Sequence, residues 1–358
     1  MEDTPPLILS VIIPARNEED CLGTCLQSLV EQQEAGWAIG VEWEIIVVDD
    51  GSTDGTRAIA AGFSGVTVMV APKLEKGWTG KNNACWAGAE KTRGQWLLFT
   101  DADTRHEPGH LRLAMVEAER HGAGMLSYSP RQVVRGLAQR ALMPLVFSDL
   151  AVTYTPAKVN DPARQVAAAN GQFLLVQRDV YDKIGGHAIV RGAILEDVEL
   201  ASLVKRRKLG LRFRYAPEAV SARMYRSFGS LVEGWTKNLA LLFRNAPALA
   251  AMRLLQLGVM VGVPMLIGFF AGEMERPGAR SGVLGPPMAI AALSLVWLRA
   301  LWGFYSRVAK SNFPFHDYVW APLGVPLYAW LLWRSWFRVR VLRQVVWKGR
   351  GQETGNRQ

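Results

Sequence analysis

The stretch Q-W-L-L-F-T-D-A-D, residues 95–103, decides the fold. Trp96 to Phe99 form a short, unbroken apolar run, which is the pattern of a strand buried on both faces of a sheet. The run ends at Thr100, and two carboxylates follow, Asp101 and Asp103. Open α/β sheets bind ligands at the carboxyl ends of their strands, where Mg²⁺ or Mn²⁺ can take carboxylate oxygens together with substrate phosphates. The stretch therefore predicts a strand end that holds a divalent cation against a phosphorylated substrate.

Three more strand-like segments precede this stretch, with helical spacing between them. They are Leu7 to Ile13, Trp43 to Val48 and Val66 to Val70. Strands that alternate with helices predict a mainly parallel sheet with right-handed crossovers. A parallel sheet brings the carboxyl ends of its strands to one edge, so the polar clusters at 16–18, 49–54 and 101–103 should converge there.

Composition narrows the possible partners. The chain has 358 residues, is 49% hydrophobic and carries a formal net charge of +9. Many basic residues lie in the C-terminal part beside long apolar runs, which indicates contact with anionic lipid headgroups. No DNA- or RNA-binding motif accompanies the charge, so we expect no nucleic-acid partner. The sequence also lacks Gly-x-Gly-x-x-Gly and Gly-x-x-x-x-Gly-Lys-Ser/Thr, which argues against dinucleotide and ATP sites of those kinds.

The three cysteines, Cys21, Cys25 and Cys85, are odd in number and have no disulfide-framework spacing, which indicates a reducing compartment. The N-terminus lacks the basic region and apolar core of a signal peptide. We therefore expect the N-terminal domain to stay in the cytoplasm.

Two long apolar runs predict membrane helices. Leu254 to Gly272 is 19 residues without a charge, close to the roughly 20 that cross a bilayer, and Ser281 to Leu298 is a second uncharged run. A third run, Tyr318 to Trp333, is shorter and contains two prolines. A third full crossing would put the basic C-terminal residues on the far side, against the positive-inside tendency. We therefore predict that the third run is re-entrant or interfacial and that the C-terminus is cytoplasmic.

Residues 131–150 have an apolar helical stripe with arginines, which fits either a helix on the membrane surface or a helix packed on the sheet.

The order of the motifs P-A-R-N-E, V-V-D-D-G-S-T-D-G-T, G-K-N-N-A, T-D-A-D, G-G-H and E-D resembles the family 2 glycosyltransferases, over roughly Leu7 to Asn245. The segments G-W-T-G-K-N-N-A, I-L-E-D-V-E-L-A and R-M-Y-R-S, followed by membrane spans, resemble the branch with lipid acceptors, which includes carotenoid, hopanoid-associated and ceramide glycosyltransferases. This resemblance implies a Rossmann-like α/β domain of the GT-A fold followed by C-terminal transmembrane helices. We expect a catalytic domain at 1–228, an interfacial amphipathic segment at 229–253, a membrane region at 254–337 and a basic tail at 338–358.

The resemblance also implies roles for individual residues. The nucleotide pocket would be lined by Pro14, Ala15, Arg16, Asn17 and Glu18. Asp50 would accept a hydrogen bond from the base, a role that suits the N3–H of uracil, and Lys81 and Asn82 would contact the nucleotide sugar. Asp101 and Asp103 match the metal motif, with Asp103 as the favoured direct ligand. Asp197 matches the catalytic base, with Glu196 as its rival.

Arg223 and Arg226 match a Gln/Arg-x-x-Arg-Trp box that contacts the diphosphate and the acceptor. Ser227 stands where tryptophan is usual, and Trp235 is a candidate for the missing indole. His187 could be a functional residue, either a metal ligand or an acceptor contact. The alternative, which we favour, is a turn histidine without a ligand.

The motifs together predict an inverting glycosyltransferase that moves a sugar from a nucleoside-diphosphate sugar, expected to be a UDP-sugar, to a lipid acceptor. Inversion follows because one base without a second nucleophilic carboxylate implies a single displacement. We expect a multi-pass protein of the inner (plasma) membrane with a cytoplasmic catalytic domain. The alternatives are a processive polysaccharide synthase, which the missing tryptophan disfavours, and a non-catalytic membrane scaffold, which the complete set of acids disfavours.

Overall fold

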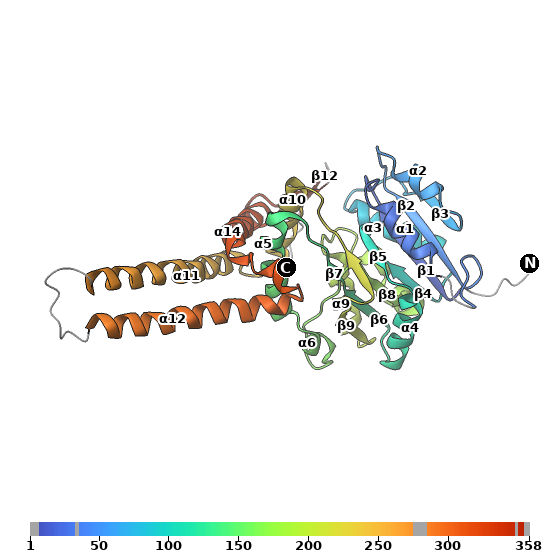
Figure 1. Ribbon diagram of the computed structural model, residues 1–358. Helices are drawn as coiled ribbons and strands as arrows, with labels where there is room; N and C mark the ends of the chain where they lie inside the picture. Colours follow the sequence, from blue (N-terminus) through green and yellow to red (C-terminus); the bar gives the residue numbers. More distant parts are fainter. Residues whose placement is uncertain (1–6, 33–35, 275–284, 348–349, 354–358) are drawn as a thin grey trace, which may run out of the picture. The chain divides into compact units, whose positions relative to one another are not determined.

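The computed structural model describes residues 7–32, 36–274, 285–347 and 350–353. The start of the second apolar run, residues 281–284, and residues 348–349 and 354–358 of the expected tail lie outside the described residues. The chain divides into two compact units (Figure 1). Of the described residues, the α/β unit comprises those within 7–133 and 154–226, and the helical unit comprises those within 134–153 and 227–353.

A seven-stranded mixed sheet forms the α/β unit. In spatial order its strands are β3 (Val66–Val70), β2 (Trp43–Asp49), β1 (Leu9–Ala15), β4 (Trp96–Phe99), β8 (Leu174–Gln177), β6 (Met125–Ser129) and β9 (Leu211–Tyr215). The first four strands are parallel, whereas β8 runs antiparallel to both β4 and β6. The register pairs Ala15 with Asp49 and Ile12 with Phe99, so β1, β2 and β4 end at one edge, as predicted.

Helices cover both faces of this sheet. They are α1 (Leu22–Val30), α2 (Thr56–Ala61), α3 (Gly80–Lys91), α4 (His110–Arg120), α6 (Pro156–Asn160), α7 (Arg178–Ile184), α8 (Gly186–Ile189) and α9 (Glu196–Arg206). Side chains alternate along a strand, so Val11 and Ile13 of β1 join the core with α1 and α4, while Ile12 joins the core with α3 and α9. A Cβ at Gly88 would lie 2.6 Å from Ile12, which explains the glycine where α3 crosses the sheet.

A second, three-stranded sheet of β5 (Thr104–His106), β10 (Val220–Ala222) and β7 (Arg131–Gln132) lies next to the Asp101–Asp103 turn in the chain. The central strand, β10, pairs antiparallel with β5 and parallel with β7. This pairing places the residue after β10 beside the Asp101–Asp103 turn: the N–H of Arg223 donates to the carbonyl of Asp103 over 3.1 Å.

The helical unit contains α5 (Gly136–Thr153), α10 (Phe228–Leu242), α11 (Ala246–Met274), α12 (Gly285–Val308), η1 (Ala309–Ser311), α13 (Phe315–Tyr318), α14 (Ala321–Trp336), η2 (Phe337–Val341), β11 (Gln344–Trp347) and β12 (Arg350–Glu353). Among the described residues, two segments are long and apolar enough to cross a membrane, Ala246–Met274 and Pro287–Ser311. Their mean hydropathies are 2.1 and 1.5, and little of either is buried within the protein.

The unit boundaries differ from those expected from the sequence. Helix α5 groups with the C-terminal helices, where it packs against α14 and η1, although residues 134–153 fell inside the expected catalytic domain. Residues 246–253 are the first turns of α11 and not part of a separate amphipathic segment. The third apolar run forms the 16-residue α14, in which Tyr328, Leu331 and Leu332 are fully buried.

Candidate active site

Hydrogen bonds join the loops that follow β1 and β2. Asn17 has a left-handed backbone, with φ of 51°, and its side-chain oxygen accepts from the N–H of Thr53 over 2.9 Å. Its own N–H donates to the hydroxyl of Ser52, and the N–H of Glu18 donates to the hydroxyl of Thr56 over 2.7 Å. Asparagine tolerates this backbone better than most residues, so both the conformation and the side chain explain its place in the motif.

Asp50 lies at the same sheet edge. Its N–H donates to the carbonyl of Ala15 over 2.8 Å, and a carboxylate oxygen is 3.8 Å from the guanidinium of Arg16. Burial raises the pKa of Asp50, and the charge of Arg16 acts in the opposite direction. The predicted hydrogen bond from Asp50 to a nucleobase stays a prediction.

The turn after β4 carries Asp101 and Asp103. The hydroxyl of Thr104 donates to the carbonyl of Asp101 over 2.8 Å, which fixes the turn. Asp103 lies 3.5 Å from the side-chain amide nitrogen of Gln172. Burial, followed by the negative charges of Asp101 and Glu18, raises the pKa of Asp103 to about 7.

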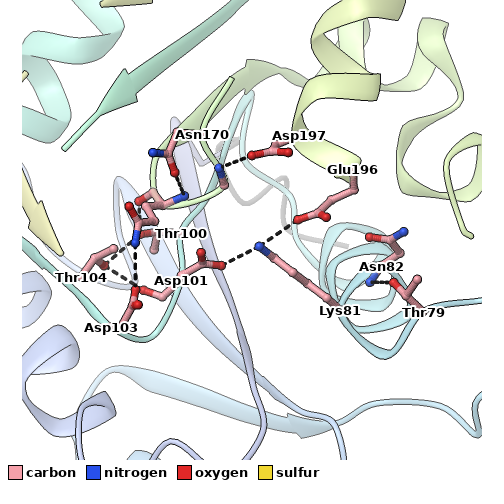
Figure 2. A network of polar contacts seen from close by, with 12 residues as sticks. Thr79, Lys81, Asn82, Thr100, Asp101, Asp103, Thr104, Asn170, Glu196 and Asp197 are labelled. Atoms are coloured by element: carbon pink, nitrogen blue, oxygen red, sulfur yellow. Dashed lines mark hydrogen bonds and ion pairs between the residues drawn. The ribbon is translucent and has the colours of Figure 1, made fainter. Parts of the chain in front are cut away.

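Lys81 extends from the first turn of α3 to two carboxylates (Figure 2). Its ammonium lies 2.7 Å from Asp101 and 2.8 Å from Glu196. Burial would lower the pKa of Lys81, but the charges of Asp101 and Glu196 outweigh it and hold the pKa well above its usual value. The lysine therefore stays charged and joins the end of β4 to the beginning of α9.

Glu196 and Asp197 begin α9, where main-chain N–H groups stabilise a carboxylate. Asp197 accepts hydrogen bonds of 2.8 Å from the N–H groups of Gly171 and Val198. Burial and the charge of Glu196 raise the pKa of Asp197 to about 7, against the opposing effect of Lys81. Asp197 therefore has the proton affinity of a general base that works near neutral pH.

A small cavity brings four of the predicted residues together: Pro14, Lys81, Asp101 and Asp197. Its remaining lining residues are Cys85, Phe99, Thr100, Gly171, Leu174, His187 and Glu196. The lining therefore comes from β1, β4, β8, α3, α8 and α9, and it combines one ammonium with three carboxylates.

Residues 10–185 match the family model described as Glycosyl transferase family 2. The chain carries a family 2 glycosyltransferase domain. With the mixed sheet and the C-terminal helices, this confirms the predicted fold class of a GT-A domain followed by helices.

The 4,4'-diaponeurosporenoate glycosyltransferase of Staphylococcus aureus strain MRSA252 is 32% identical over 244 residues, 65% of this chain and 60% of the relative. The same enzyme of strain USA300 is 31% identical over the same length. The match thus spans about 60% of the length of these curated relatives.

Solved structures resemble the chain more weakly. The mannosyltransferase PcManGT from Pyrobaculum calidifontis, in complex with GDP-Man and Mn²⁺, has a TM-score of 0.48 at 17% identity and covers 94% of this chain and 89% of its own. Glucosyl-3-phosphoglycerate synthase from Mycobacterium tuberculosis, in complex with Mn²⁺, UDP-Glc and phosphoglyceric acid, has a TM-score of 0.41 at 19% identity and covers 66% and 78%.

Two acids of the family 2 domain could hold a divalent cation. Among the described residues, no group of three or more histidines, cysteines and acids is arranged as a metal site, and the two candidate ligands are Asp101 and Asp103. Mg²⁺ usually binds through one or two carboxylates with waters and substrate phosphates. The raised pKa of Asp103, caused by burial and by like charges, is a condition that a bound cation would relieve. The donor set therefore fits a cation that binds together with a diphosphate.

Asn82 has a different environment from that of Lys81. Its side chain is fully buried, and the amide nitrogen donates to the carbonyls of Val190, Arg191 and Ala193 over 2.8–3.0 Å. These bonds hold the loop before α9, so Asn82 has a structural role in the family 2 domain. Its predicted contact with the nucleotide sugar stays a prediction.

Other predicted residues lie outside the cavity lining. Arg226 is exposed, and Arg223 is partly exposed. Trp235 belongs to the helical unit, where its indole N–H donates to the sulfur of Met143 and its ring packs on Phe147. The predicted substrate contacts of these three residues stay predictions.

His187 lines the cavity and is buried. It hydrogen-bonds Tyr181 over 2.9 Å and packs edge-on against Phe99. Burial and the charge of Lys81 lower the pKa of His187 to about 3, so the ring is neutral.

Sequence reasoning missed a buried polar network beneath the Asp101–Asp103 turn. The ring of His106 bonds the hydroxyls of Thr100 and Thr104, and Thr100 also donates to the carbonyl of Gln172 over 2.8 Å. Gln172 in turn accepts from the amide of Gln132. Burial lowers the pKa of His106 to about 3, so this support is uncharged. The polar side chains Thr104 and His106, which alternate after the turn, were the available sequence signal.

Proposed function

We propose that the chain is a metal-dependent inverting glycosyltransferase that transfers a sugar from a UDP-sugar to a lipid acceptor at the cytoplasmic face of a membrane. The observation that carries the proposal is the arrangement of Asp197, Lys81 and Asp101 around one cavity of a family 2 domain. The name of the S. aureus relatives supports a lipid-like, carotenoid-type acceptor.

Each residue then has a chemical task. Asp197 takes the proton of the acceptor hydroxyl while the N–H groups of Gly171 and Val198 hold its carboxylate in place. The acceptor oxygen forms its bond to the anomeric carbon as the bond to the diphosphate breaks, and the nucleoside diphosphate leaves with the electron pair. Lys81 and the arginines at 223 and 226 offset charge on this leaving group. A divalent cation at Asp101 and Asp103 would supply further charge stabilisation there.

Two exposed apolar helices support the membrane location. Leu255 and Met265 on α11 are 70% and 72% exposed, and Leu295 and Trp302 on α12 are 69% and 72% exposed. Contiguous apolar surface of this kind is unfavourable in water and marks a membrane or protein contact. Their lengths of 29 and 24 residues favour a bilayer.

The test is transfer of labelled sugar from UDP-sugars to extracted membrane lipids, measured with the full chain in detergent. We expect Asp103→Ala to abolish transfer, and Asp197→Asn to lower it by about 10²–10⁴-fold without changing the affinity for UDP-sugar, because it removes the base but keeps the size. The control Asp179→Asn removes one exposed carboxylate and should leave transfer unchanged.

The result would count against the proposal if Asp103→Ala retained full transfer, or if wild-type transfer were complete in excess chelator. Asp197→Asn with unchanged transfer would reject a protein base in the single displacement. An acceptor that presents a carboxylate, which the ending -oate in the name of the S. aureus relatives denotes, needs no proton removed. The Asp197→Asn comparison therefore uses a lipid acceptor that carries a hydroxyl.

A further inference from the structure

We propose that Lys81 blocks the divalent-cation site until a nucleoside diphosphate arrives, because its ammonium pairs with one of the two carboxylates that the cation would use. The inference rests on the proposed function, since it takes Asp101 and Asp103 as the cation ligands. It adds a task for Lys81 beyond contact with the donor: it makes cation binding depend on nucleotide binding.

Two carboxylates hold the ammonium of Lys81 (Figure 2). Asp101 lies 2.7 Å away and Glu196 2.8 Å away, and these two acids come from the end of β4 and the beginning of α9. On a third side, a Cβ added at Gly171 would lie only 2.8 Å from the ammonium, so Lys81 packs against bare backbone there. The two ion pairs therefore place the ammonium at Asp101, close to the backbone of Gly171.

The charge balance at the turn is uneven. Within the described part of the chain, Asp101 pairs with Lys81, whereas Asp103 has no ion-pair partner. A divalent cation that arrives alone must compete with the ammonium for Asp101, and the two positive charges repel each other at this short distance. The free protein therefore offers the cation one available carboxylate, Asp103, in place of two.

A nucleoside diphosphate changes this balance. Its phosphate oxygens give the Lys81 ammonium another anionic partner, which releases Asp101, and they also complete the coordination shell of the cation. Cation and nucleotide then strengthen each other's binding by the same factor, as linkage requires. Without the ammonium, the two acids would be available to the cation at all times, and the coupling would fall.

The experiment measures Mn²⁺ binding to the full chain in detergent by the electron paramagnetic resonance of free Mn²⁺, with and without UDP. The test variant is Lys81→Met, which keeps an unbranched chain and removes the charge. The matched control is Lys91→Met, which removes an exposed positive charge from the other end of α3. A third variant, Asp103→Asn, reports whether the bound Mn²⁺ is at the proposed site.

We expect Lys81→Met to bind Mn²⁺ alone at least about tenfold more tightly than the wild type, and to lose most of the gain that UDP gives. Lys91→Met should behave like the wild type. If UDP strengthens Mn²⁺ binding in the wild type but Lys81→Met binds Mn²⁺ alone no better, the blocking role is wrong and the proposed function stands. If the wild type binds no Mn²⁺ with UDP, or Asp103→Asn binds it equally well, the metal assignment itself fails, and the inference fails with it.

Discussion

Glu196 and Asp197 are adjacent in sequence but have different partners. Glu196 pairs with Lys81, whereas Asp197 accepts hydrogen bonds from backbone N–H groups. Adjacent residues of a helix point in different directions, so one carboxylate can face an acceptor while its neighbour sets its electrostatic surroundings. The assignment of Asp197 as the base, with Glu196 as its rival, stays a prediction.

This difference predicts how the reaction depends on pH. A base with a pKa of about 7 is protonated below that pH, so kcat/KM should fall about tenfold per unit of pH on the acid side. The charge of Glu196 raises the pKa of Asp197, and Lys81 lowers it. Glu196→Gln removes the negative charge that raises the pKa of Asp197. The acid limb of the variant's profile should therefore lie about one pH unit below that of the wild type, while transfer persists.

The measurement is the pH profile of kcat/KM for both proteins with one donor and one lipid acceptor. A limb that stays in place would show that Glu196 does not tune the base. If Glu196→Gln lost transfer at every pH while Asp197→Asn kept full transfer, Glu196 and not Asp197 would be the base.

At the scale of elements, a buried ion cluster joins four helices of the helical unit. Asp149 of α5 accepts from Arg253 of α11, from Arg307 of α12 over 2.8 Å and from Tyr328 of α14 over 3.0 Å. Asp149 and Arg253 are each 1% exposed. Removal of the one acid leaves a buried arginine without its counter-ion, which typically costs about 3–5 kcal/mol.

We therefore predict that Asp149→Ala lowers the free energy of unfolding by about that amount, measured by denaturant unfolding of the full chain in detergent. Asp179→Ala is the control, because it breaks an exposed pair with Lys183 that should contribute less than about 1 kcal/mol. Equal stability of the two variants would mean that the cluster does not hold the helices together.

Sequence patterns predict some elements of the structure and not others. The apolar run of β4 has one physical cause, burial on both faces, so it predicts a central strand and the acids at its end. The turn at 170–173 has no comparable pattern, yet in it the N–H of Gly171 donates to Asp197 and the side-chain amide of Gln172 donates to Asp103. Asp149 meets Arg307 across 158 residues of chain. Such contacts depend on how helices pack, which neither periodicity nor motif spacing encodes.

At the scale of the whole molecule, we predict that α11 and α12 cross the bilayer out and back, with the segments before α11 and after α12 on the cytoplasmic side. The charges support this topology. Arg307 lies in the last turn of α12 and Lys310 follows it. Arg334 lies in the last turn of α14, and Arg338 and Arg340 follow it. Positive residues near membrane helices favour the cytoplasmic side. With 16 residues, α14 is about 24 Å long at 1.5 Å per residue, short of the roughly 30 Å hydrocarbon core. The helix continues directly into η2, but that segment carries Arg338 and Arg340 and does not extend the apolar run.

Reporter fusions test this topology. A fluorescent protein fused to the C-terminus should fold and fluoresce in the cytoplasm, and alkaline phosphatase fused there should stay inactive. Alkaline phosphatase fused after Met274, at the end of α11, should be active, because one crossing carries it to the far side. An active phosphatase at the C-terminus would mean that α14 also crosses, and that the basic residues after it lie outside against the positive-inside tendency. The length of α14 and the charges that follow it both argue for the first result.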